Sequence, residues 1–173
     1  MKSTVSTTSG GVNKWSAARY KSTLNMTASY DFREFTTNLV PNGDFEGAEA
    51  RWTPAESIVE RADAHGGGKV LGVDPAAGRP VVSSDVFVIP PGQSLRFSFY
   101  MRTGYLPKAA YISVKDVDTQ SVVFEEALQP EPTGKWIAKS AAFKSDGTSV
   151  RAQIVCTARV GTITFDDMSL VSV

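Results

Sequence analysis

The only histidine of the chain, His65, stands in the run His65-Gly66-Gly67-Gly68, where its neighbours could supply backbone donors to an oxyanion. A hydrolase that uses such a run also needs a nucleophile, and the chain has no G-x-S-x-G elbow to provide one. With one His and one Cys, neither a supported catalytic triad nor an ordinary zinc cluster can be assembled. We therefore interpret the glycines as a tight turn between strands.

Adjacent carboxylates could also do chemistry, and they occur as Glu125-Glu126 and Asp166-Asp167. Successive side chains of a strand point to opposite faces, so neither pair can face one substrate as general acid and base. The sequence thus predicts a protein that is not an enzyme.

Composition excludes several partner classes. The net charge of the 173 residues is zero and the pI is near 6.6, so nothing in the overall charge attracts nucleic acid or an anionic membrane. No apolar run approaches the ~18 residues that cross a bilayer, and residues 1–11 lack the apolar core of a secretory signal. We expect no nucleic-acid partner, no membrane insertion, synthesis without a signal peptide, and a buried thiol at Cys156.

Residues 38–173 show the alternation of β-strands. Apolar residues recur at every second position over residues 95–101 and 150–158, with polar residues between most of them. Further strands are expected at residues 69–73, 81–89, 111–117, 122–128 and 136–143. The best candidate for a short helix is residues 48–51. Strands of this length, separated by Gly and Pro, predict an all-β fold, a jelly-roll β-sandwich with an extended N-terminal arm.

The last strand carries an irregularity. Ile163 and Phe165 share one face, whereas Met168 and Leu170 share the other, so the apolar face changes at Asp166-Asp167. A β-bulge at this point would redirect one carboxylate.

Two motifs bound the β-rich part, NLVPNGDFEG at residues 38–47 and TFDDMSL at residues 164–170. We expect them to lie side by side as the first and last strands. Together with Trp52, the run DAHGGGKVLGV at residues 63–73 and Lys135-Trp136, they resemble the carbohydrate-binding modules of the galactose-binding-like jelly-roll superfamily. The resemblance covers residues 38–173, and it implies that Trp52 and Trp136 pack in the core.

The resemblance also implies a structural Ca²⁺ ion. Such modules commonly hold it between the Glu of the opening motif and an Asp of the closing motif, which correspond to Glu46 and Asp167, with Asp44 and Asp166 nearby. Carboxylate and carbonyl oxygens suit Ca²⁺. The alternative is that these acids cap turns and face water.

Sugar binding in such folds uses an aromatic ring beside polar groups. The candidates are Arg96, Tyr100 and Arg102 on the solvent side of one strand, with Tyr105 and Tyr111 on or next to neighbouring strands. The alternative is an ordinary exposed strand face in which the Arg stems cover apolar surface.

Residues 1–37 differ from the rest. The segment is rich in Ser, Thr and Gly, carries a net charge of +3, and its aromatic residues follow no period. It is either a disordered tail or an arm that anchors the domain to a neighbouring subunit, and we favour the arm. The residues expected to contact the partner are Trp15, Tyr20, Tyr30, Phe32 and Phe35.

Two functions fit these features. The first is a bacteriophage virion structural protein, such as a capsid decoration, collar or tail component, attached through its arm, homo-oligomeric and located in the virion. The second is a carbohydrate-binding module or adhesin that recognises a cell-surface polysaccharide.

Overall fold

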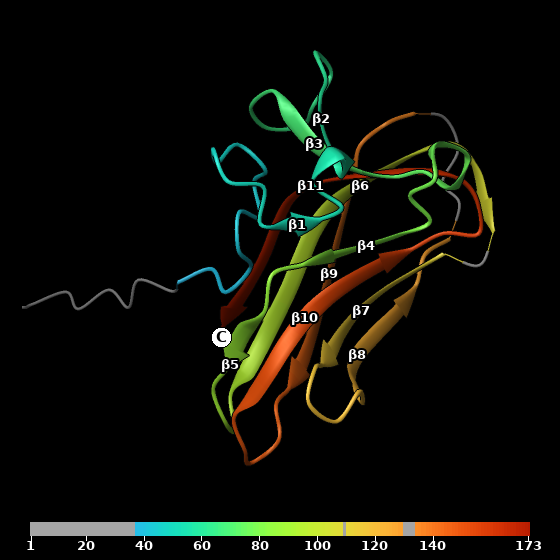
Figure 1. Ribbon diagram of the computed structural model, residues 1–173. Helices are drawn as coiled ribbons and strands as arrows, with labels where there is room; N and C mark the ends of the chain where they lie inside the picture. Colours follow the sequence, from blue (N-terminus) through green and yellow to red (C-terminus); the bar gives the residue numbers. More distant parts are fainter. Residues whose placement is uncertain (1–36, 109, 130–133) are drawn as a thin grey trace, which may run out of the picture. The chain divides into compact units, whose positions relative to one another are not determined.

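Two antiparallel sheets face each other across a common core (Figure 1). The computed structural model describes residues 37–108, 110–129 and 134–173. The predicted arm and its five aromatic residues therefore lie outside the described residues. Thr36–Val173 form one compact unit, and everything below concerns that unit.

The first sheet has six strands and the second has five. In the first, the order is β1-β4-β10-β7-β8, and β5 also pairs with β10. Its strands are β1 (Trp52–Thr53), β4 (Val81–Ser84), β5 (Phe87–Ile89), β7 (Tyr111–Asp116), β8 (Val122–Ala127) and β10 (Val150–Thr157). In the second, the order is β2-β3-β11-β6-β9. Its strands are β2 (Ile58–Glu60), β3 (Lys69–Val73), β6 (Ser94–Lys108), β9 (Ile137–Lys144) and β11 (Val160–Ser172).

This arrangement is the predicted jelly-roll β-sandwich. Two short 3₁₀ turns, η2 (Ala55–Ser57) and η3 (Pro75–Ala77), are the helical elements of the described residues. No helix in that part of the chain is long and apolar enough to cross a membrane.

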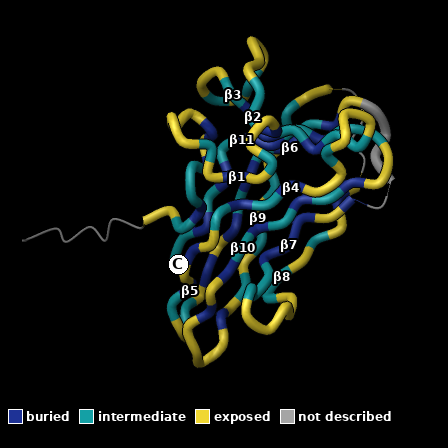
Figure 2. The backbone as a smooth tube through the Cα atoms, in the orientation of Figure 1, coloured by how far each residue is buried: buried dark blue, intermediate teal, exposed yellow. Residues whose placement is uncertain are grey.

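The alternating strands supply the core as expected. Leu95, Phe97, Phe99 and Met101 of β6 are at most 3% exposed, and β10 contributes Ile154 and Cys156, both fully buried. Figure 2 shows the buried segments running along the strands, with exposed residues gathered in the loops. Cys156 is the buried cysteine that the sequence predicts, and its burial raises the pKa of the thiol.

The opening and closing motifs lie side by side. Leu39 N donates to Leu170 O at 2.9 Å, and Met168 N donates to Gly43 O at 2.8 Å. The side chain of Asn38 donates to Met168 O and accepts from Leu170 N, each at 2.9 Å. The opening motif is nevertheless a series of turns and not the expected first strand. The first strand, β1, begins only at Trp52.

The β-bulge in the closing strand is present. Asp166 pairs with Tyr100 of β6, but Ser169 pairs with Ser98, so β11 contains one residue more than β6 over this interval. Asp167 adopts φ 48°, and Phe165, Asp166 and Met168 are all buried. The bulge thus keeps apolar side chains in the core on both sides of two consecutive carboxylates.

The strand expected at residues 81–89 is interrupted. Ser83 pairs with Val155 and Phe87 with Ala152, which leaves one extra residue between β4 and β5. The Ser84 hydroxyl accepts a hydrogen bond from Ile154 N at 3.0 Å in the gap. A side-chain oxygen therefore replaces the backbone acceptor at this point.

Candidate functional site

The loop between β2 and β3 contains Asp63, His65 and the three consecutive glycines. Arg61 N donates to Gly68 O at 2.8 Å, which closes the loop as the turn that the sequence predicts. A Cβ atom on Gly67, which has φ +62°, would lie 2.0 Å from Glu46 Oε2. A Cβ atom on Gly66 would lie 2.9 Å from both carboxylate oxygens of Asp167. The left-handed backbone favours glycine at Gly67, and a side chain at either position would displace the acidic side chain beside it.

Glu46 of the opening motif holds the end of this loop. Its Oε2 atom accepts hydrogen bonds from Gly68 N at 2.7 Å and from Lys69 N at 2.9 Å. The N–H groups of Lys69 and Gly68 lower the pKa of the Glu46 carboxyl, because they stabilise its charged form.

The two aspartates of the bulge both contact the middle of the same loop. The prediction that Asp166 and Asp167 point to opposite faces is therefore wrong, because the bulge redirects one of them. Asp166 Oδ2 accepts from His65 N at 2.8 Å and from Gly66 N at 3.0 Å, and Asp166 Oδ1 accepts from Asp167 N at 2.9 Å. The Nδ1 atom of His65 lies 2.7 Å from Asp167 Oδ2. Burial raises the pKa of the Asp166 carboxyl, and the N–H groups of Gly66 and His65 oppose that increase.

Three aromatic rings gather where this loop covers β6. The His65 and Tyr100 rings stack with their centroids 3.4 Å apart and an interplanar angle of 18°. The Trp136 ring meets His65 edge-on at 6.2 Å. We call His65, Tyr100 and Trp136 the aromatic cluster.

Arg102 joins the aromatic cluster to the loop. Its guanidinium carbon lies 5.1 Å from the centroid of the Trp136 ring, and its Nη1 atom lies 2.9 Å from Asp63 Oδ2. The Trp136 indole N–H donates to the backbone carbonyl of Asp63 at 2.8 Å. Hydrogen bonds from Arg102 and Arg61 lower the pKa of Asp63 to about 2. Asp63 therefore carries a charge at neutral pH and ties two guanidinium groups to the loop.

The structure brings together two of the five predicted ligand-binding residues, and the side chain of Tyr105 lies outside what the structure describes. Tyr100 and Arg102 lie next to each other on the outer face of β6, because Met101 between them points into the core. Arg96 is on the same face but six residues from Arg102, which is roughly 20 Å along a strand. Tyr111 is 40% exposed on β7 in the other sheet, so it does not share this site.

The prediction that Trp136 packs in the core is wrong, whereas Trp52 does pack there. Trp52 is 2% exposed and meets Phe45 edge-on at 5.5 Å. Trp136 is only half-buried, because it precedes β9, the edge strand of its sheet. Its ring lies over polar residues of the outer face instead.

Sequence reasoning also missed Asp63 and His65 as members of this site. Both stand in the DAHGGG run, which the sequence singled out for its glycines and not for its position beside β6. A run of three glycines preceded by Asp63 and His65 was the available signal, since a loop so depleted of side chains is suited to close packing.

The predicted calcium site stays a prediction. Asp44 is exposed, its Oδ1 atom accepts from Glu46 N at 3.3 Å, and it lines one surface cavity together with Asp167. Among the described residues, no group of three or more His, Cys, Asp and Glu side chains is arranged to hold a metal ion. The oxygens of Glu46 and Asp166 that face the β2–β3 loop meet N–H donors there.

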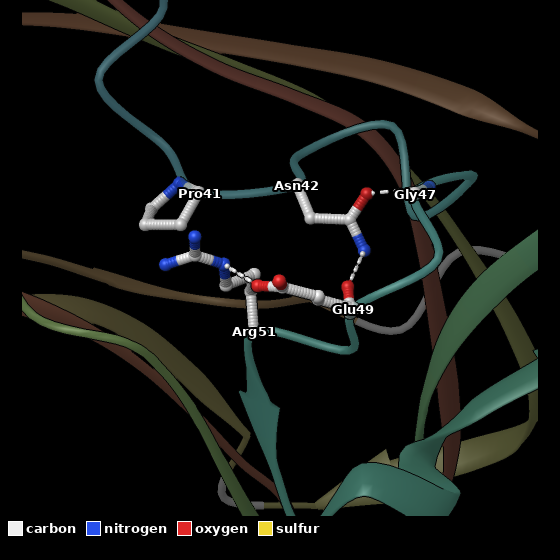
Figure 3. A pocket seen from close by; sticks show the side chains of 5 residues that line it. All are labelled: Pro41, Asn42, Gly47, Glu49 and Arg51. Atoms are coloured by element: carbon white, nitrogen blue, oxygen red, sulfur yellow. Dashed lines mark hydrogen bonds and ion pairs between the residues drawn. The ribbon is translucent and has the colours of Figure 1, made fainter.

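A second cavity lies in the opening loop, between Pro41 and Arg51 (Figure 3). Asn42 spans it: its Oδ1 atom accepts from Gly47 N at 2.8 Å, and its Nδ2 atom donates to Glu49 O at 3.1 Å. Arg51 Nε lies 2.9 Å from Glu49 Oε1. These bonds hold residues 48–51 as an irregular loop, so the predicted short helix is absent. The polar groups that line the cavity pair with each other.

Comparison with known proteins places this geometry in a structural context. No protein-family model and no curated protein matches the sequence. Solved structures do match. A family 16 carbohydrate binding module aligns with TM-score 0.57 and 15% identity, covering 77% of this chain and 99% of the module. TmCBM61 in complex with β-1,4-galactotriose aligns with TM-score 0.50 and 17% identity, covering 78% of this chain and 97% of that one.

The likeness establishes the fold alone. The β-sandwich accounts for nearly the full length of both modules. The enzymatically active domain of bacteriophage CBA120 tailspike protein 4 also aligns, with TM-score 0.53 and 14% identity. That match covers 79% of this chain but only 21% of the tailspike chain.

Proposed function

We propose that this protein is a non-catalytic glycan-binding module. The observation that carries the proposal is the aromatic cluster on the outer face of β6, which lies on a fold shared with carbohydrate-binding modules. Sugar rings present flat C–H surfaces that stack on aromatic faces, and their hydroxyl groups need paired donors and acceptors nearby.

The cluster offers both kinds of contact. Trp136 and His65 supply ring surface, and Arg102, Arg61 and Asp63 supply charged donors and acceptors around it. The polar groups are held in place by their own hydrogen bonds, so little ordering is needed when a ligand arrives. A preformed site of this kind suits a module that binds sugar without altering it.

The test is retention of the full chain on polysaccharide gels of β-1,4-galactan, xylan and a soluble β-glucan. The first is chosen because TmCBM61 is described in complex with β-1,4-galactotriose. We expect at least one gel to retard the wild type and Trp136→Ala to lose that retardation. Tyr111→Ala, on the other sheet, is the matched control and should behave as wild type. Equal loss in both variants, or no retention on any gel, would contradict the proposal.

A virion role is a second candidate. It is supported by the likeness to a domain of a bacteriophage tailspike protein. The residues proposed to attach the protein to its particle are Trp15, Tyr20, Tyr30, Phe32 and Phe35. Light scattering of the full chain tests this: the virion role predicts an oligomer that Phe32→Ala together with Phe35→Ala dissociates. A monomeric wild type would leave the module as the remaining candidate.

A further inference from the structure

Carboxylates from opposite ends of the domain meet on one loop. We propose that Glu46 and Asp166 are positioning residues of the glycan site, which hold the β2–β3 loop through backbone N–H groups and without a metal ion. This inference rests on the proposed function, because the loop they hold carries His65 and Asp63. Glu46 and Asp166 accept hydrogen bonds from four backbone N–H groups of this loop. We call the two carboxylates and these four N–H groups the carboxylate clasp.

The first argument is the chemistry of the atoms that face each other. Glu46 Oε2 and Asp166 Oδ2 each accept two backbone N–H donors, at 2.7–3.0 Å. N–H groups present the positive end of their dipole, so they occupy the place that a cation would take beside these oxygens. A Ca²⁺ ion would instead require six to eight oxygen ligands, with carbonyl oxygens turned inward.

The second argument is the fit between the loop and the clasp. Gly67 approaches the clasp so closely that a Cβ atom on it would lie 2.0 Å from Glu46 Oε2. The bulge in β11 presents Asp166 to the loop although the residue is fully buried. The loop can therefore be seated against the carboxylates directly, with no atom between them.

The third argument is the route from the clasp to the ligand site. Asp166 holds the backbone of His65, whose ring stacks on Tyr100. The same loop provides the carbonyl that fixes the Trp136 indole. Displacing the loop therefore moves His65 and Trp136, two of the three rings of the aromatic cluster, although neither Glu46 nor Asp166 belongs to that cluster.

Glu46 offers a sharp experiment, since both of its hydrogen bonds reach one oxygen. Glu46→Gln keeps a carbonyl oxygen that can accept both bonds but removes the negative charge, whereas Glu46→Ala removes the acceptor. Asp44→Asn is the control for a nearby acid outside the clasp. Each full-length variant is measured for glycan affinity and melting temperature, in chelator and in Ca²⁺.

With a metal-free clasp, Glu46→Gln stays within about threefold of wild-type affinity, and Glu46→Ala loses about tenfold. Asp44→Asn and the chelator change nothing. The ¹H–¹⁵N spectrum gives a signature of the bonds themselves: the amide shifts of Gly68 and Lys69 move in Glu46→Ala and are retained in Glu46→Gln.

Two results would overturn the clasp. One is a melting temperature or affinity that rises with Ca²⁺ and falls with chelator. The other is a Glu46→Gln variant as impaired as Glu46→Ala, since the acceptor oxygen that Gln retains would then not replace the carboxylate. If the wild type binds no glycan, the proposed function fails, but the melting and amide-shift measurements still decide for or against the clasp.

Discussion

The imidazole of His65 lies flat on the phenol ring of Tyr100, with 3.4 Å between the ring centroids. The stack covers one face of the tyrosine that the sequence marks as a ligand-binding candidate. His65 is therefore the ring that the loop presents above β6, and Tyr100 is its support.

His65→Ala should weaken both glycan binding and the fold. The stacked pair is worth about 0.5–1.5 kcal/mol beyond the burial of its surface, so urea unfolding should show a loss of about that size. His65→Phe keeps the stack and removes the contact with Asp167, so it should recover most of the lost stability. If the His65→Ala and His65→Phe variants lose the same free energy of unfolding, the stack contributes nothing.

The tryptophans Trp52 and Trp136 should separate stability from binding. Trp52 is buried in the core, so Trp52→Ala should lower the free energy of unfolding by about 3–5 kcal/mol. Trp136→Ala should cost much less stability, because Trp136 lies outside the core. It should abolish retention on the glycan gel, because Trp136 belongs to the aromatic cluster. Chemical denaturation and gel retention of both variants measure the two effects. A Trp136 variant as unstable as the Trp52 variant would place Trp136 in the core after all.

Asp63 should make the loop sensitive to strong acid. Its pKa is lowered from the ordinary value of 3.8 to about 2 by hydrogen bonds from Arg102 and Arg61. Because the folded-state pKa is the lower one, the stabilising contribution is fully present above about pH 4 and is lost as the pH falls through about 2. Carboxyl-carbon NMR titration of the full chain should show this midpoint. Arg102→Met should move it upward, and an unchanged midpoint would mean that the Arg102 pair is absent in solution.

Gly43 should be intolerant of any side chain. A Cβ atom there would lie 2.2 Å from the backbone oxygen of Met168, at the junction of the opening and closing motifs. Gly43→Ala should therefore destabilise the protein by about 1–3 kcal/mol in urea unfolding. Gly147→Ala is the matched control, since its Cβ atom would meet nothing within 4 Å. Similar stabilities for the two variants would show that the junction adjusts without cost.

Much of the fold could be predicted from the sequence, because it depends on local patterns. Alternation over residues 95–101 predicts which side chains of β6 are buried, and the change of face at Asp166-Asp167 predicts the bulge. Both follow from the two-residue period of a strand, which can be recognised without knowing which other strands pair with it. The paired motifs at the two ends likewise predict their own adjacency.

The errors arose where a residue's environment is set by distant segments. The resemblance to carbohydrate-binding modules implied that Trp136 packs in the core, but the edge position of β9 leaves it outside. Residues 81–89 were predicted as one strand. The interruption could not be foreseen, because it depends on a hydrogen bond from Ile154 N of β10 to the Ser84 hydroxyl. Tyr111 and Tyr100 looked like neighbours, and sheet order separates them.

The sequence by itself determined the class of fold, the buried faces of the strands and the identity of the acidic and glycine-rich motifs. Only the tertiary structure decided which of those motifs meet: Glu46, the β2–β3 loop and Asp166 come from three separate parts of the chain. The physical reason is that strand periodicity is a local property of the backbone. The contacts of a loop, by contrast, depend on which strands the sheet topology places beside it.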